Sequence, residues 1–87
     1  MALSRSELAE NILEVVRSES QDQSVQITMD TLIKDVSIDS VDVINILFRL
    51  EDEYKVSIDL DVQAQPEKVG DLVNALIEFI PHDEDTK

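Results

Sequence analysis

The sequence predicts an all-α fold, a small bundle of three main helices plus one short helix. Apolar residues recur at three- and four-residue intervals in three separate stretches of the 87-residue chain, which is the spacing of amphipathic helices. One further stretch, residues 56–62, alternates apolar and polar residues as a strand does. No second segment of the chain has a strand pattern of comparable strength to pair with it. Because a lone hairpin would be marginally stable, we expect no sheet.

The first helix is predicted to run from about Ser4 to Ser18. Ser4 and Glu7 have the spacing of a capping box, and Leu3 and Leu8 stand at staple positions on either side of it. The apolar stripe of this helix consists of Leu8, Ile12, Val15 and Val16.

A long loop is predicted for residues 18–38, because a polar run at 18–24 precedes scattered apolar residues. A structureless segment of this length is uncommon in a compact domain. We therefore expect the apolar residues to pin the loop to the core, with one helical turn near Asp30 to Lys34. These anchors are Val25, Ile27, Met29, Leu32, Ile33 and Val36.

The second helix is predicted from Ser40 to about Tyr54, with Asp39 as the N-cap and Asp42 near the positive end of the helix dipole. Its apolar residues are too many for one narrow stripe. We expect this helix either to be buried on more than one side or to carry a binding face. The apolar residues are Val41, Val43, Ile44, Ile46, Leu47, Phe48 and Leu50.

Two further helices are expected in the last third of the chain. A short one is placed near Asp61 to Gln65, limited by Pro66. The last begins at Val69 or Gly70 and ends at Phe79, before Pro81. We expect one domain over residues 1–80 and a short, disordered acidic tail over residues 81–87.

Charge restricts the classes of partner. Twenty acidic and seven basic residues give a net charge of −13, which disfavours nucleic acids and anionic membranes and favours proteins with basic patches. The absence of Cys excludes disulfide and thiolate chemistry and suits a cytoplasmic protein. We expect no membrane insertion, because no apolar run approaches the ~18 residues that span a bilayer.

Catalysis by the chain itself is not expected. The only His is His82, in the predicted tail, where a base for a nucleophilic Ser would not be held in place. With Gly70 as the single Gly, neither a phosphate-binding loop nor an EF-hand is present, and we expect no metal site.

The tetrapeptide Asp39-Ser40-Val41-Asp42 opens the second helix, and caps of this kind are common. Its context is more specific. The stretch from Leu32 to Tyr54 resembles the acyl carrier protein signature, in which an Asp-Ser-Leu element opens the second helix and an acidic cluster followed by an aromatic residue closes it. The order and spacing of the other elements resemble this family over nearly the whole chain. A cofactor-free acidic interaction module is the alternative.

The resemblance implies an acyl carrier protein, a monomer that is no enzyme. A phosphopantetheinyl transferase would attach 4′-phosphopantetheine from coenzyme A to Ser40, and the arm would carry acyl thioesters to enzymes of fatty-acid, lipid or polyketide biosynthesis. By position, it implies partner recognition by Asp39, Val41, Asp42, Phe48, Glu51 and Asp52, for which an ordinary solvated face is the alternative. It also implies an acyl-chain pocket, for which simple core packing is the alternative. The residues that would form this pocket are Val43, Ile44, Leu47, Ile58, Leu60, Ala75 and Leu76.

Several positions depart from the family pattern. The departures are Ser37 in place of Gly, Val41 in place of Leu, Asn45 in place of an acidic residue, Phe48 in place of Met, and the basic Arg49. Because they alter the recognition face more than the attachment site, we hypothesise a specialised carrier with dedicated partners. Peptidyl carriers often place Gly-Gly and then His or Asp before the modified Ser, which residues 36–38 do not resemble. A peptidyl or aminoacyl carrier is therefore the second choice.

Overall fold

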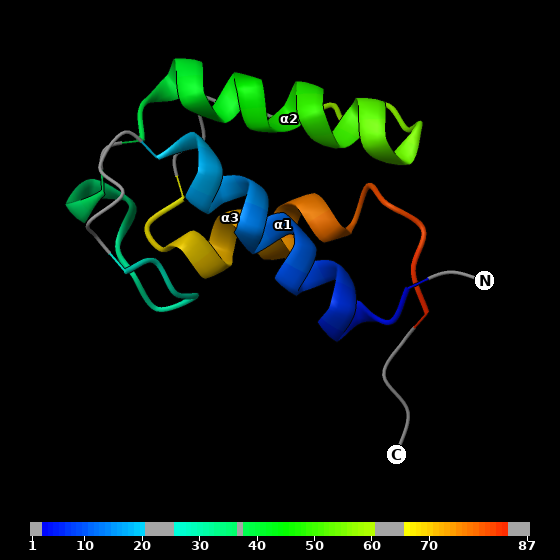
Figure 1. Ribbon diagram of the computed structural model, residues 1–87, viewed down its shortest axis with the longest axis horizontal. Coiled ribbons are helices and arrows are strands. Elements are labelled where there is room, and N and C mark those ends of the chain that lie inside the picture. Colours follow the sequence, from blue (N-terminus) through cyan, green and yellow to red (C-terminus); the bar gives the residue numbers. More distant parts are fainter. Residues whose placement is uncertain (1–2, 21–25, 37, 61–65, 84–87) are drawn as a thin grey trace.

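Three α-helices dominate the computed structural model, which describes residues 3–20, 26–36, 38–60 and 66–83. They are α1 (Arg5–Glu19), α2 (Ser40–Tyr54) and α3 (Val69–Ile77), and a short 3-10 helix, η1 (Ile33–Asp35), precedes α2. The helix α1 packs against both α2 and α3 (Figure 1). Within the described ranges the only bridges between extended residues are isolated ones, so the predicted all-α fold is confirmed. The short helix expected at Asp61–Gln65 lies outside the described residues.

The starts of α1 and α2 are fixed by reciprocal capping boxes. In α1, the Glu7 N–H donates to Ser4 Oγ at 3.2 Å, and the Ser4 N–H donates to Glu7 Oε1 at 3.1 Å. In α2, the Asp42 N–H donates to Asp39 Oδ1 at 3.0 Å, and the Asp39 N–H donates to Asp42 Oδ2 at 3.2 Å. The sequence predicted both N-caps, and the structure adds that Asp42 completes the second box.

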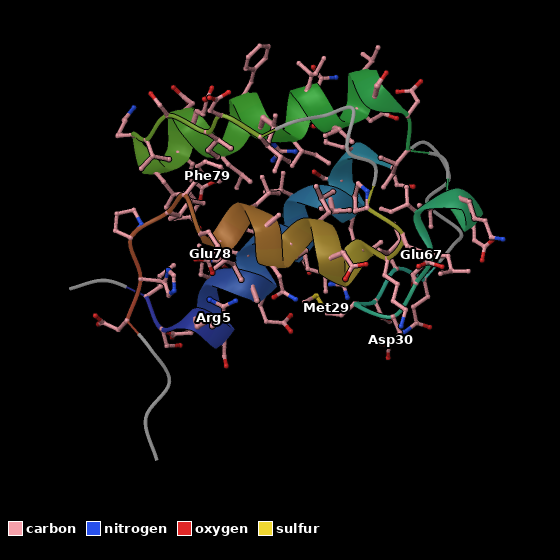
Figure 2. The ribbon with its side chains drawn as sticks, turned by 180° about the vertical axis from the view of Figure 1, so that it is seen from behind. Arg5, Met29, Asp30, Glu67, Glu78 and Phe79 are labelled. Carbon is pink, nitrogen blue, oxygen red and sulfur yellow. The ribbon has the colours of Figure 1, made fainter. Side chains whose placement is uncertain are left out.

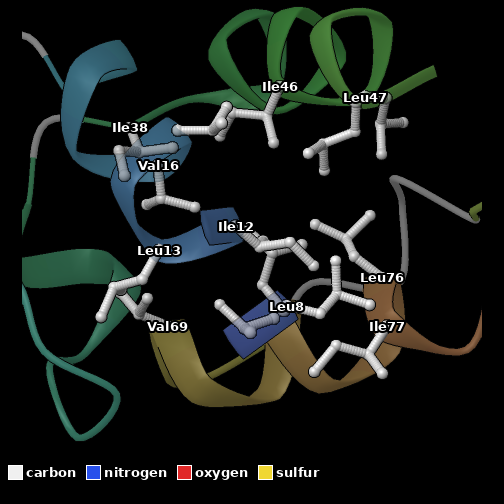
Figure 3. Packing of buried hydrophobic residues seen from close by; sticks show 14 of the residues in the cluster. Leu8, Ile12, Leu13, Val16, Ile38, Ile46, Leu47, Val69, Leu76 and Ile77 are labelled. Carbon is white, nitrogen blue, oxygen red and sulfur yellow. The ribbon is translucent and has the colours of Figure 1, made fainter. Parts of the chain in front are cut away.

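The core lies where the three helices meet. Figure 3 shows buried side chains from all three helices gathered in one cluster, among them Ile12 of α1, Leu47 of α2 and Leu76 of α3. Burying a side chain of this size stabilises the fold by roughly 1.5–3 kcal/mol relative to leaving it exposed. The helices are therefore held together mainly by these apolar contacts.

The described part of the long loop packs on the core through Ile27 and Val36, as the sequence predicted, and is also joined to the start of α3; the predicted anchor Val25 lies outside the described residues. Ile27 is buried, and the Gly70 N–H donates to the Met29 carbonyl at 2.8 Å. The approach is close enough that a Cβ at position 70 would lie 2.7 Å from that carbonyl oxygen. Farther along, the Ile33 N–H donates to the Glu67 carbonyl at 2.9 Å. The expected helical turn is observed as η1, at the end of the predicted range.

The chain after α3 differs from the expectation. The helix ends at Ile77 rather than Phe79, and a turn follows. Although a disordered tail was expected from residue 81, residues 81–83 are held against the start of the chain. The Asp83 N–H donates to the Leu3 carbonyl at 2.7 Å, and the Arg5 N–H donates to the Asp83 carbonyl at 2.8 Å. Residues 84–87 lie outside the described ranges.

Candidate functional site

Ser40 is the first residue of α2 and is exposed to solvent. The capping box of Asp39 and Asp42 fixes the backbone on either side of it. The N–H groups in the first turn of a helix have no acceptor within the helix, and the positive end of the helix dipole lies there. A hydroxyl at this position is accessible to another protein, and a phosphate group attached to it would face the favourable end of the helix.

The two acidic residues beside Ser40 have different surroundings. Asp39 is exposed, whereas Asp42 is only 6% exposed and its carboxylate accepts the Asp39 N–H. Both were assigned to partner recognition on the sequence, and that assignment stays a prediction. The structure gives Asp42 a definite role in the fold, because its buried carboxylate holds the start of α2.

An exposed apolar stripe runs along the outer face of α2. Val41, Ile44 and Phe48 are 61%, 36% and 63% exposed, and they are the exposed large hydrophobic residues of the described chain. Their spacing of three and four residues puts them on one side of the helix. Ile44, expected in an acyl-chain pocket, thus lies on the same stripe as Val41 and Phe48, which were expected to contact partners. The side chains of the outer face of α2 point away from α1 and α3 (Figure 2).

The charged residues in the second half of α2 are partly used within the fold. Glu51 Oε2 accepts the Ile58 N–H at 2.7 Å, which ties the segment after α2 back to the helix. Asp52 is exposed, with Oδ1 3.8 Å from Lys55 Nζ. Of these two recognition candidates, Asp52 has the more accessible carboxylate.

Arg49 joins α2 to the end of α1. Its Nη1 lies 3.0 Å from Glu19 Oε2 and also donates to Ser18 Oγ. On the sequence, Arg49 was a positive charge within the recognition helix. In the fold, that charge faces the carboxylate of Glu19, and the side chain is about half exposed.

The residues assigned to an acyl-chain pocket lie mostly in or beside the core. Leu47, Ile58 and Leu76 are buried in the hydrophobic cluster, and Val43 and Leu60 pack against it. Ala75 is half-buried. Leu47 and Leu76 reach toward the same space between α2 and α3 (Figure 3). The structure therefore shows their packing, and a pocket formed by them stays a prediction.

His82 is held in place, contrary to the expectation of a frayed tail. Its Nδ1 lies 2.8 Å from the Ile80 carbonyl oxygen and its Nε2 lies 3.5 Å from Arg5 Nη1. The segment that carries it lies at the end of the molecule opposite to the start of α2 (Figure 1). His82 is thus too distant to act as a base for Ser40, which is a different reason from the one that the sequence suggested.

In the described ranges, no group of three or more His, Cys, Asp or Glu residues is placed to hold a metal ion. No helix there combines the length and the hydropathy needed to cross a bilayer.

A groove beside the start of α2 was not foreseen from the sequence. Its volume is about 350 Å³. We call it the loop groove, because it is formed by η1, the residues between η1 and α2, and the residues just before α3. Its described lining consists of Ile33, Lys34, Val36, Ile38, Pro66 and Glu67. The two strips of lining residues are more than 25 positions apart in the chain, so no local pattern could have indicated the groove.

Comparison with known proteins gives one match. A family model described as the phosphopantetheine attachment site matches residues 8–76. The matched region contains η1, all of α2 and most of α1 and α3, with Ser40 inside it. No curated protein and no solved structure matches the chain.

Proposed function

Because the chain belongs to the family of phosphopantetheine attachment domains, whose prosthetic group is 4′-phosphopantetheine, we propose that Ser40 carries this group. Such a domain is a carrier and is not itself catalytic. The observation that supports Ser40 is its position, an exposed hydroxyl in the first turn of α2 within the matched region.

The other described serines of the matched region fit the role less well. Ser18 Oγ is engaged with the Val15 carbonyl and with Arg49, and Ser20 is only 4% exposed. Ser57 is exposed but lies in the connection after α2, away from any helix start. Ser40 alone among them combines exposure with a helix N-terminus, where a phosphodiester is favoured.

Attachment requires chemistry supplied by a partner. The Ser40 hydroxyl loses its proton and its oxygen bonds to the phosphorus of the phosphopantetheine half of coenzyme A, while the nucleotide half leaves. The chain has no Cys, so the terminal thiol of the arm is the only thiol of the modified protein. That thiol supplies the thioester linkage for the cargo.

We propose acyl groups as the cargo, delivered to enzymes of fatty-acid, lipid or polyketide biosynthesis. The support is the resemblance of residues 32–54 to acyl carriers, and the lack of a peptidyl-type sequence at residues 36–38. The outer stripe of α2 is the proposed docking face, with Val41 and Phe48 as apolar contacts and Asp39 and Asp52 as exposed charges. Charges of this kind mainly raise the rate of encounter with a basic partner.

The test is modification followed by intact mass measurement. The protein is incubated with coenzyme A, Mg²⁺ and a phosphopantetheinyl transferase of broad specificity, and we expect a mass gain of one phosphopantetheine. Ser40→Ala should abolish the gain. Ser6→Ala, which makes the same change at an exposed serine in the first turn of α1, is the matched control and should retain it. A gain that survives Ser40→Ala would show that another residue is modified.

A further inference from the structure

We propose that the loop groove holds the phosphopantetheine arm of the modified protein, with the phosphodiester of the arm near Lys34. This inference rests on the proposed attachment at Ser40 and adds where the arm lies between deliveries. It is carried by the position of the groove, the composition of its walls and the pairing of the cations around it.

The groove begins next to the proposed attachment point. Ile38 lines the groove and stands two residues before Ser40, so their Cα atoms are at most about 7 Å apart. Figure 1 shows η1 and the segment that leads into α3 at the same end of the molecule as the start of α2. An arm attached at Ser40 is thus present at high effective concentration beside the groove, which a free ligand is not.

The walls of the groove suit the chemistry of the arm. Val36 and Ile38 are buried and Ile33 and Pro66 are half-buried, which gives an apolar floor. Such a floor matches the geminal methyl groups and short hydrocarbon links of pantetheine. The volume of about 350 Å³ lies in the range of roughly 300–1,000 Å³ that small-molecule sites occupy.

Two cations at this end of the molecule have no ion pair among the described residues. Four of its six Lys and Arg residues face carboxylates, in the pairs Arg5–Glu78, Arg17–Glu14, Arg49–Glu19 and Lys55–Asp52. The other two, Lys34 and Lys68, have no ion pair among the described residues. Lys34 lines the groove. Lys68 is not a lining residue but directly follows one, Glu67, which is labelled in Figure 2.

The phosphodiester of the arm is an anion that could use this charge. At Ser40 the N-terminus of α2 attracts it, whereas the neighbouring carboxylates of Asp39 and Asp42 repel it. Among the described lining residues of the groove, Lys34 is the only cation and Glu67 the only carboxylate, and both are exposed. Laying the arm in the groove buries its apolar part, and we infer that the Lys34 ammonium, which has no ion pair among the described residues, attracts the phosphodiester.

The experiment uses the modified protein itself. Uniformly ¹³C,¹⁵N-labelled protein is modified with unlabelled coenzyme A, so that isotope-filtered nuclear Overhauser spectra report only contacts between the arm and the chain. We expect contacts from the geminal methyls of the arm to the methyl groups of Ile33, Val36 and Ile38. Lys34→Glu should weaken them by about 1.4- to 5-fold, the effect of an exposed charge pair. Lys55→Glu, the same charge change at the far end of α2, should leave them unchanged.

The outcomes separate the two proposals. A mass gain without groove contacts, with contacts instead to Leu47 and Ile58 or with none, would overturn this inference and leave the attachment intact. Equal weakening by Lys34→Glu and Lys55→Glu would overturn the placement of the phosphodiester near Lys34. If no mass gain occurs, the proposed function itself fails, and this inference fails with it.

Discussion

Replacing Asp42 by Ala tests whether its carboxylate caps α2. The variant removes the acceptor of the Asp39 N–H, now at 3.2 Å, and a negative charge from the first turn of the helix. The lost hydrogen bond is worth about 0.5–1.5 kcal/mol and the lost interaction with the helix dipole about 0.3–1 kcal/mol. We therefore expect the free energy of unfolding to fall by about 1–2.5 kcal/mol.

The change is measurable by urea unfolding and by thermal unfolding, each followed by circular dichroism. For a loss of about 1.5 kcal/mol, the Tm of a domain of this size falls by about 6–12 °C. Asp52→Ala is the matched control, because it removes the same group from an exposed position in the same helix and should cost less than about 0.5 kcal/mol. If both variants unfold at the same urea concentration with the same slope, the capping role that we assign to Asp42 is refuted.

Three further variants separate fold from docking. Gly70→Ala should destabilise the protein by about 1–3 kcal/mol in urea unfolding, because the added Cβ would lie 2.7 Å from the Met29 carbonyl oxygen; unchanged stability would show that the loop shifts freely. Arg49→Ala should cost no more than about 1 kcal/mol in the same assay, because the Arg49 side chain is about half exposed, and a larger loss would show that its pair with the more buried Glu19 matters more to the fold. Phe48→Ala should change stability by less than about 0.5 kcal/mol but lower the kcat/KM for modification of Ser40, measured by intact mass over time. An unchanged kcat/KM would remove Phe48 from the surface that the transferase contacts.

The sequence was most informative where a structural rule is local. The second helix was expected from Ser40 to about Tyr54 and has those bounds, because Asp39 gives a cap and the apolar spacing gives the helix. The first helix and its box at Ser4 follow from the same kind of signal. These features depend on residues within one or two helical turns of each other, which a single sequence displays.

Features that depend on distant residues were missed. The pairing of Arg49 with Glu19 requires the angle between α1 and α2, and the position of His82 requires residues 81–83 to meet the start of the chain. The same distinction between local and distant residues applies to the candidate site. Ser40 was predicted as the attachment site from its local context and stays a prediction, whereas the loop groove arises only when η1 approaches the residues before α3.

The surplus of apolar residues in α2 was expected either to bury the helix on more than one side or to form a binding face, and the structure shows one buried side and one exposed apolar side. The apolar residues at positions 43, 46, 47 and 50 follow one side of the helix and pack in or against the core, while those at positions 41, 44 and 48 follow another side and are exposed. An exposed apolar side chain contributes little to folding, so the outer stripe can change with little effect on stability. The inner side packs on the core and thereby positions Ser40, whereas the outer side is not needed for packing and is the proposed docking face. Substitutions on the outer side, such as Phe48→Ala, are therefore the ones expected to alter recognition while the fold is retained.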